Sequence, residues 1–264
     1  MFSKRFAPAA FALLAVTAAT AQASNIMPSF GTVPAGWTTD RYDPATFSNV
    51  GNYQGRNNVL GIGIDASGDL ANRPGAYQSY FYNTQGKAAA AVGGAGSSLA
   101  ADLYIPTSWG SSANGDVRTD LWGVATDGTD PTAYGIIGFT NFGGAARLRV
   151  YDGDVAGGWV DLATAITYDA WVDLAVRFTG SSLVFSVNGS DVYTDNTITG
   201  TTGFGSVIMQ AYNFADPSLG DTVNRPYVAH WADAASTDVP EPASLALIGL
   251  GLACLGGLRR KSQG

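Results

Sequence analysis

The stretch that decides the fold runs from residue 171 to residue 193 and reads WVDLAVRFTGSSLVFSVNGSDVY. Its first eight residues alternate, so that every second side chain from Val172 to Phe178 faces one side while Asp173 and Arg177 face the other. Asn188-Gly189 is the strongest short hairpin signal, because a type I′ turn needs positive φ at both positions. The stretch therefore predicts antiparallel β-strands with one buried face.

Short β-rich runs separated by Gly, Asn, Asp and Ser clusters continue in both directions, and helical periodicity is nearly absent between residues 40 and 235. The further predicted strands are Val59–Ile64, Tyr77–Tyr82, Leu99–Ile105, Thr119–Ala125, Tyr134–Thr140, Ala146–Tyr151, Trp159–Leu162, Val207–Asn213 and Pro226–Trp231. About a dozen short strands in one chain predict an all-β fold, a jelly-roll sandwich of two stacked antiparallel sheets.

Two segments depart from the strand pattern. Residues 84–98, TQGKAAAAVGGAGSS, are low in complexity and are predicted to form a flexible loop. Residues 232–239 are predicted to tether the domain to the C-terminal segment. The remainder predicts one domain within residues 24–238, which is long enough to bury a sizeable core.

The opening stretch also resembles a known group of domains. Residues 171–178, the turn with two serines, residues 183–189 and Val192-Tyr193 are similar to the central hairpins of laminin-G-like, concanavalin A-like domains. Those domains are jelly-roll sandwiches, and many of them bind carbohydrate. The resemblance is a packing pattern, so it concerns the fold, and a fold does not determine a function.

Charge and composition exclude several function classes. Residues 24–238 contain nine Arg and Lys against twenty Asp, a net charge of −11. This acidic surface argues against nucleic acid and anionic lipid as partners, and it is equally compatible with a protein that binds uncharged sugars. Cys254 is the only cysteine and lies in the C-terminal apolar run, so the domain has no disulfide and no thiolate zinc site.

The chain contains one glutamate, Glu241, and one histidine, His230. A glycosidase with two carboxylates would have to use aspartates alone, and a Ser-His-Asp hydrolase would have to use His230. His230 alternates with Ala229 and Trp231 in a strand pattern, where a lone histidine is a structural hydrogen-bonding residue more often than a catalyst.

The N-terminal 23 residues predict a secretory signal peptide. Lys4 and Arg5 precede an apolar stretch, and the small residues Ala21 and Ala23 form an A-x-A cleavage site for signal peptidase. We therefore expect export across the inner membrane.

Residues 239–264 begin with VPEPASLALIGLGLACLGGLRRK. The apolar run 243–258 has no polar face and predicts a transmembrane helix that passes transiently through the inner membrane. Arg259, Arg260 and Lys261 form a basic stop on the cytoplasmic side. Pro240 and Pro242 keep the preceding segment extended, a form that a protease can bind as a strand.

The order and spacing of Pro240, Glu241 and Pro242, the apolar run and the basic tail resemble the PEP-CTERM sorting signal of Gram-negative bacteria. The resemblance implies recognition by an exosortase, an integral-membrane, transpeptidase-like protease. It further implies a cell-surface or extracellular destination in a producer of polysaccharide and biofilm matrix. It implies a route and no activity.

Two tryptophans are candidates for stacking on sugar rings. Trp109 lies in the loop-like stretch 106–110, and Trp159 follows Gly157-Gly158. For each, a buried anchoring role remains the alternative.

Clustered aspartates are candidates for calcium, since carboxylate oxygens are its preferred ligands. The candidate ligands are Asp65 with Asp69 and Asp127 with Asp130. Asp also favours turns by bonding to its own backbone, so plain turns are the alternative, as they are for Asp152-Gly153-Asp154. No cofactor other than calcium is expected.

Concanavalin A-like glycosidases carry a Glu-x-Asp-x-Glu strand that this sequence lacks. We therefore predict that the protein is not an enzyme and that the domain binds extracellular polysaccharide without catalysis. A structural matrix protein with no specific ligand and an aspartate-based lyase or hydrolase remain as alternatives.

Overall fold

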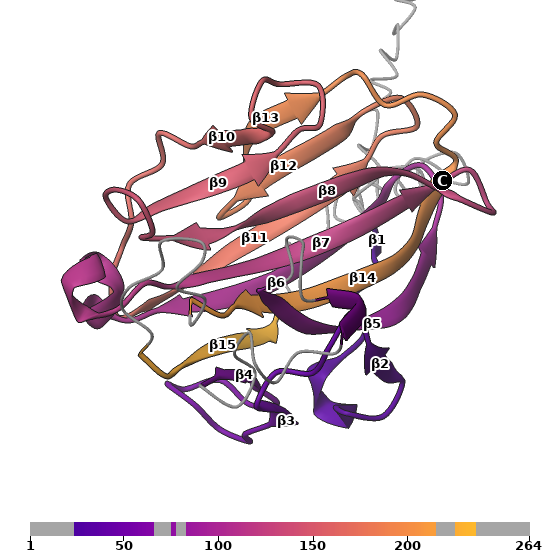
Figure 1. Ribbon diagram of the computed structural model, residues 1–264. Helices are drawn as coiled ribbons and strands as arrows, with labels where there is room; N and C mark the ends of the chain where they lie inside the picture. Colours follow the sequence, from indigo (N-terminus) through magenta and orange to yellow (C-terminus); the bar gives the residue numbers. More distant parts are fainter. Residues whose placement is uncertain (1–23, 66–74, 78–82, 215–224, 236–264) are drawn as a thin grey trace, which may run out of the picture. The chain divides into compact units, whose positions relative to one another are not determined.

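The computed structural model describes residues 24–65, 75–77, 83–214 and 225–235. Within these ranges the chain folds as two stacked β-sheets connected by loops and short 3₁₀ turns (Figure 1). The predicted all-β sandwich is confirmed. The 3₁₀ turns span Phe30–Thr32, Gly75–Tyr77, Thr107–Gly110 and Ser112–Asn114.

The first sheet has eight strands in the order β13-β12-β11-β6-β15-β4-β3, with β1 beside β6. Its strands are β1 (Ser24–Asn25), β3 (Thr46–Asn49), β4 (Leu60–Ile64), β6 (Ser97–Ile105), β11 (Ala170–Phe178), β12 (Leu183–Val187), β13 (Ser190–Asp195) and β15 (Tyr227–Asp233). Every pairing is antiparallel except that of β1 with β6.

The second sheet has seven strands in the order β10-β9-β8-β7-β14-β5-β2, all antiparallel. Its strands are β2 (Trp37–Thr39), β5 (Thr84–Gly93), β7 (Arg118–Thr126), β8 (Pro131–Thr140), β9 (Arg147–Tyr151), β10 (Trp159–Asp161) and β14 (Gly203–Tyr212). The long strands β7, β8 and β14 lie side by side in Figure 1 and form the middle of this sheet.

The opening stretch forms β11, β12 and β13, as its pattern predicts. Leu174 and Val176 are fully buried, whereas Asp173 and Arg177 lie on the other face. The hairpin turn has φ of 49° at Asn188 and 74° at the following glycine, the positive values that a type I′ turn requires.

A buried hydrogen bond joins the two sheets. The indole of Trp231 on β15 is completely buried, and its Nε1–H donates to Thr119 Oγ1 on β7 at 2.9 Å. The Thr119 hydroxyl in turn donates to the backbone carbonyl of Gln210 on β14 at 2.8 Å. A polar group this deep needs such a partner, so the bond fixes how β15 faces the second sheet.

The Tyr227 hydroxyl makes a second link between the sheets. It accepts from the backbone N–H of Tyr212 at 3.0 Å and lies 2.7 Å from the Tyr212 carbonyl and 2.8 Å from that of Arg118. These backbone groups stand where the ladder between β7 and β14 ends. Burial raises the pKa of Tyr227 far above its usual range, so the hydroxyl stays protonated.

The prediction that residues 84–98 form a flexible loop is wrong for most of this segment. Residues 84–93 form β5, which pairs with β14 on one side and β2 on the other. The small side chains are what this place in the sheet requires, because a Cβ at Gly86 would lie 2.3 Å from the Met209 carbonyl oxygen. Ala89 and Ala91 face the core.

The predicted tether begins later than expected, because Ala232 and Asp233 belong to β15. The carboxylate of Asp233 accepts from the Ser29 hydroxyl at 2.6 Å and from the Phe30 N–H at 2.7 Å. The predicted signal peptide and C-terminal helix lie outside the described residues. Among the residues that are described, no helix is long and apolar enough to span a bilayer.

Replacing Tyr227 with Phe should destabilise the domain by about 1–3 kcal/mol, because buried backbone groups lose their partner. Urea unfolding of the full chain measures the change. Tyr168→Phe is the matched control, since Tyr168 is exposed and should lose little. Equal stability of the two variants would contradict the role assigned to Tyr227.

Candidate binding site on the outer face of the seven-stranded sheet

Alternation along β7 separates the two faces of the second sheet. Leu121 and Ala125 pack in the core. Arg118, Asp120 and Trp122 therefore project from the opposite, outer face.

Strand register aligns large side chains across this outer face. Paired positions in neighbouring strands run from Trp159 through Tyr151 and Ile136 to Trp122. The Tyr151 and Trp159 rings meet edge to face with their centroids 5.2 Å apart, and Trp122 meets Tyr134 in the same way at 6.1 Å. The register thus gathers four aromatic rings from β7, β8, β9 and β10.

A polar row lies one step further along the same strands. Paired positions run from Asp161 through Arg149, Gly138 and Asp120 to Gln210. Glycine is required within the row, because a Cβ at Gly138 would lie 2.3 Å from Asp120 Oδ1. The carboxylate of Asp120 therefore lies against the backbone of β8.

A pocket of about 280 Å³ opens on the outer face. Its lining residues are Arg41, Thr84, Arg118, Trp122, Tyr134, Ile136, Tyr151 and Trp159. Apolar and aromatic walls with a few polar groups are typical of a pocket that binds a small molecule or a segment of a polymer.

Arginine side chains contact the aromatic rings of the pocket. The Arg118 guanidinium lies 4.7 Å from the Trp159 ring centroid and 5.2 Å from that of Tyr212, and its Nε donates to Asp120 Oδ2 at 2.7 Å. Arg41 lies 5.0 Å over Trp122. These contacts hold the rings and the cations together on one face.

Arg149 differs from the other arginines of this face. Its side chain is only 8% exposed, and its guanidinium carbon lies 3.7 Å from the Trp159 ring centroid. No carboxylate within the described ranges forms an ion pair with it. Burial is the main reason that the pKa of Arg149 falls to about 10, which still leaves the group charged at neutral pH.

Four buried side-chain atoms on the outer face have no hydrogen-bond partner among the residues that the structure describes. They are Asp120 Oδ1, Trp122 Nε1, Arg149 Nε and Gln210 Oε1. Two of them are donors and two are acceptors. Because native proteins pair most buried polar groups, such a cluster marks a place where a ligand can supply the partners.

The two predicted sugar-stacking tryptophans differ in their surroundings. Trp159 lines the pocket and carries the stacked guanidinium of Arg149. Trp109 is only 6% exposed, and its ring packs 5.3 Å from Phe139 and 6.1 Å from Tyr227. The 3₁₀ turn at residues 107–110 directs Trp109 into the core, where it also contributes to the lining of a second pocket of about 330 Å³.

The predicted calcium ligands do not form a carboxylate cluster in the described part of the chain. Asp127 Oδ1 accepts from the N–H groups of Thr129 and Asp130, each at 2.8 Å, which lowers the pKa of Asp127. These bonds close the turn between β7 and β8. Asp65 follows β4, and Asp69 lies outside the described residues.

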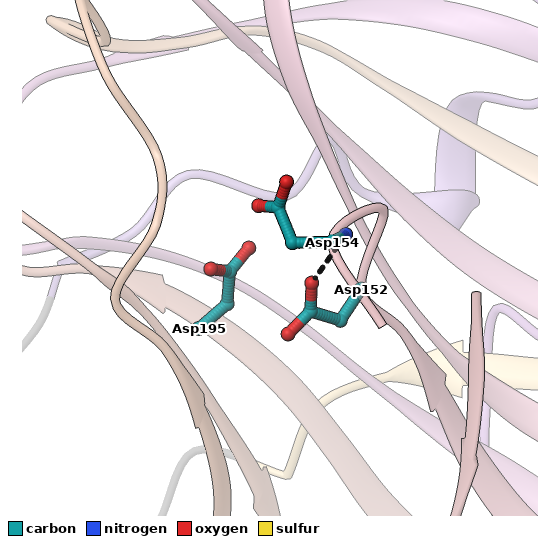
Figure 2. A group of neighbouring side chains, drawn as sticks. All are labelled: Asp152, Asp154 and Asp195. Atoms are coloured by element: carbon teal, nitrogen blue, oxygen red, sulfur yellow. Dashed lines mark hydrogen bonds between the residues drawn. The ribbon is translucent and has the colours of Figure 1, made fainter. Parts of the chain in front are cut away.

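Three other carboxylates do come together, as Figure 2 shows. Oxygens of Asp152, Asp154 and Asp195 lie within 4.8 Å of one another, a spacing that suits a cation. Asp152 also accepts from the Tyr193 hydroxyl at 2.7 Å, and this bond raises the pKa of Tyr193 to about 12. From the sequence, Asp152 and Asp154 were weighed between calcium ligands and a plain turn, whereas Asp195, which β13 brings beside them, was missed.

His230 projects away from the core, opposite to Ala229 and Trp231, as alternation predicts. Its imidazole stacks on the Tyr53 ring with centroids 3.8 Å apart and planes within 6°. The two rings line the same second pocket of about 330 Å³. Burial lowers the pKa of His230.

Residues 238–261 match the model of the PEP-CTERM protein-sorting motif. The chain carries a PEP-CTERM sorting motif. This motif marks a secreted protein that is transiently anchored at the membrane and processed by exosortase. The residues predicted to form it, from Pro240 to Lys261, lie outside the described part of the structure. A search of curated proteins finds no match to the sequence.

Several solved structures share the architecture. An endo-glucanase of glycoside hydrolase family 16 from Bacteroides ovatus is 14% identical, covers 77% of this chain and 96% of its own, and has a TM-score of 0.47. The β-glucanase of Bacillus licheniformis is 15% identical, with coverages of 76% and 92% and a TM-score of 0.44. The carbohydrate-binding module CBM66 of Bacillus subtilis is 12% identical, with coverages of 72% and 94% and a TM-score of 0.38. At these identities the likeness concerns the fold alone.

These structures correct the prediction that the protein is not an enzyme. Most of them are glycoside hydrolases, so the fold is one that enzymes use. The prediction relied on the missing Glu-x-Asp-x-Glu strand. The absence of one motif does not classify a chain of this fold as non-catalytic.

The single histidine permits a direct test of the burial at the second pocket. We expect the pKa of His230 to lie below 6.5, because the half-buried imidazole is disfavoured in its charged form. Proton NMR titration of the one imidazole measures it. Tyr53→Leu should expose the ring to water and move its pKa upward toward 6.5. A wild-type pKa at or above 6.5 would exclude this explanation.

The lowered pKa of His230 determines how the stability of the folded protein changes with pH. Above pH 6.5 the imidazole is neutral in both folded and unfolded chains, and its contribution to stability is fully present. As the pH falls through the folded pKa, the unfolded chain binds a proton more readily and that contribution is lost. His230→Gln should remove this part of the pH dependence.

Proposed function

We propose that the protein is an exported surface or matrix protein whose domain, residues 24–238, binds extracellular polysaccharide at the aromatic pocket of the seven-stranded sheet. The support is the coincidence on one face of four aromatic rings and four buried polar atoms that lack partners within the described residues. The sorting motif supports the setting, because it directs a protein out of the cell.

The chemistry of the face suits a sugar. Each sugar ring has apolar C–H faces that pack on aromatic rings and hydroxyl groups that both donate and accept hydrogen bonds. Trp122 lines the pocket, and Asp120, Arg149 and Gln210 lie on the same outer face as buried groups outside its lining. The face thus combines buried donors at Trp122 and Arg149 with buried acceptors at Asp120 and Gln210, a mixture that suits a polyhydroxylated ligand better than a simple anion.

Trp159 has the central role in this proposal. It lines the pocket, lies beside Tyr151 and is held in place by the guanidinium of Arg149. A ring fixed in this way loses little conformational freedom when a sugar packs against it, which favours binding.

We also propose the steps by which the protein is exported and processed. Signal peptidase cleaves after Ala23, and the apolar run 243–258 holds the chain in the inner membrane of a Gram-negative cell. Exosortase then processes the segment at Pro240, Glu241 and Pro242, with Arg259, Arg260 and Lys261 on the cytoplasmic side. The processed protein reaches the cell surface or the matrix.

Trp159→Ala should weaken binding to the producer's own polysaccharide at least tenfold. Affinity is measured with the full chain in a detergent that carries no sugar headgroup, with and without calcium. Trp171→Ala is the matched control, because Trp171 lies on the outer face of the other sheet and should not affect binding. Thermal unfolding of both variants verifies that they are folded.

Failure of the wild-type chain to bind with or without calcium would overturn this proposal and favour a structural matrix protein. Release of reducing ends from the same samples, measured over hours, reports whether bound polysaccharide is also cleaved.

Glu241→Ala should leave the precursor unprocessed in the membrane fraction, because it removes the carboxylate between Pro240 and Pro242 of the sorting motif. Immunoblotting of membrane and culture fractions from the producer measures the distribution. Thr237→Ala, just outside the matched residues 238–261, is the control and should be processed normally. Normal release of the Glu241 variant would contradict the assigned role.

A further inference from the structure

Arg41 and Arg118 line the pocket, whereas Arg149 lies outside its lining and packs against Trp159, which belongs to it. Not all arginines of this outer face are paired with a carboxylate. Arg41 pairs with Asp40 at 2.8 Å. Arg118 pairs with Asp120 at 2.7 Å, and Arg147 pairs with Asp161 at 2.8 Å. Arg149 is the fourth arginine of this face, and within the described ranges it has no ion pair. The face therefore carries one uncompensated positive charge, located at Arg149.

The neighbours of Arg149 explain why it stays unpaired. Asp161 is its register partner on β10, but Oδ1 of that carboxylate accepts from Arg147 Nε. On the other side the register partner is Gly138, which has no side chain. Asp120 lies beyond the glycine and accepts from Arg118 and Gln210 through Oδ2. Each nearby carboxylate is thus held by another group.

Burying a charge without a partner is unfavourable, and the pKa of Arg149 falls to about 10 mainly because of this burial. Packing on Trp159 offsets part of the desolvation, yet Nε remains without an acceptor in the described structure. Such an arrangement is maintained at functional sites more often than in plain cores. An anionic group of a ligand would supply the missing partner of the Arg149 guanidinium.

On this basis we propose that the pocket selects a polysaccharide that bears carboxylates, such as one that contains uronic acids, and that Arg149 pairs with the sugar carboxylate. The inference rests on the proposed function of the same pocket and adds the class of sugar. A planar guanidinium matches a carboxylate with two parallel hydrogen bonds, and such a charge-assisted pair is stronger than a neutral hydrogen bond. Neutral hydroxyls at this position would leave the buried charge unpaired.

The net negative charge of the chain does not prevent a sugar carboxylate from pairing with Arg149 once the two groups are in contact. Residues 24–238 carry a net charge of −11, but exposed charges more than about 8 Å away are largely screened at physiological ionic strength. The buried guanidinium is screened much less. The local charge at the pocket therefore decides which sugar is preferred.

The test compares one polysaccharide in two forms. Polysaccharide from the producer is used before and after carbodiimide–borohydride reduction, which converts each carboxylate to a neutral hydroxymethyl group and keeps the backbone. Affinity for both forms is measured with the full chain in the same detergent at physiological ionic strength, where the exposed charges of the chain are largely screened. We expect the wild type to bind the native form at least tenfold more tightly than the reduced form.

Arg149→Gln should abolish that preference while binding of the reduced form persists. Arg149→Lys keeps the charge without the planar guanidinium and should retain part of the preference, which also covers the case in which the Gln variant does not fold. Arg177→Gln removes the same charge from the other sheet, where Arg177 pairs with Asp191, and should leave the preference intact.

The outcomes separate the two proposals. Equal binding of both forms by the wild type would overturn the selection of carboxylates and leave polysaccharide binding in place. A preference that survives in Arg149→Gln would overturn the role of Arg149. Binding of neither form would overturn the proposed function itself, and the selection with it.

Discussion

The pairing of Trp231 with Thr119 is the interaction on which the positions of the outer side chains depend. Trp231 is completely buried on β15, and its N–H reaches the one hydroxyl that β7 directs into the core. Because side chains alternate along a strand, holding Thr119 inward directs Arg118 and Asp120 outward. The Thr119 hydroxyl also bonds to the Gln210 carbonyl on β14. A bond in the interior therefore sets the register of the polar row on the outside.

The outer face departs from the rules that the rest of the domain follows. In the core, apolar side chains pack against each other and Trp231 has its partner. On the outer face, Asp120 is completely buried with Oδ1 unpartnered within the described structure, and Arg149 is buried without an ion pair there. Local conflicts of this kind reduce stability and are retained where function needs them. Four buried polar atoms without partners in the described structure gather on this face, and a further one, Asp102 Oδ1, lies on β6 of the other sheet.

Sequence patterns predicted the parts of the fold in which local signals agree with the final packing. Strand β11 alternates cleanly and Asn188-Gly189 specifies the turn between β12 and β13, so both predictions were correct. Strand β5 was missed because its alanines and glycines have low strand propensity on their own. Their small size is required by the close approach of β14, which only the assembled sheet reveals.

The candidate site could be predicted only in part for the same reason, because most of its residues come together only in the assembled sheet. Trp159 was found from its place after a glycine turn, but its neighbours Tyr151, Ile136 and Trp122 meet it only through the register of four strands. For Trp109 the sequence left a sugar-stacking role and a buried anchoring role open, and its buried ring favours the anchoring role. One signal in the sequence could have indicated this face. Arg118, Asp120 and Trp122 occupy alternate positions of β7, which places them on the same side of the sheet.

Net charge and local charge act at different stages of recognition. Residues 24–238 carry a net charge of −11, which slows the approach of a polyanion when the ionic strength is too low to screen it. The charge of Arg149 is buried beside Trp159, so in the proposed complex it would act only at short range, once a ligand is bound. Rates of association and specificity are therefore set by different residues. An acidic composition argues against DNA, whose binding depends on many phosphate contacts at an extended basic surface. It does not argue against a sugar carboxylate that meets a single enclosed guanidinium.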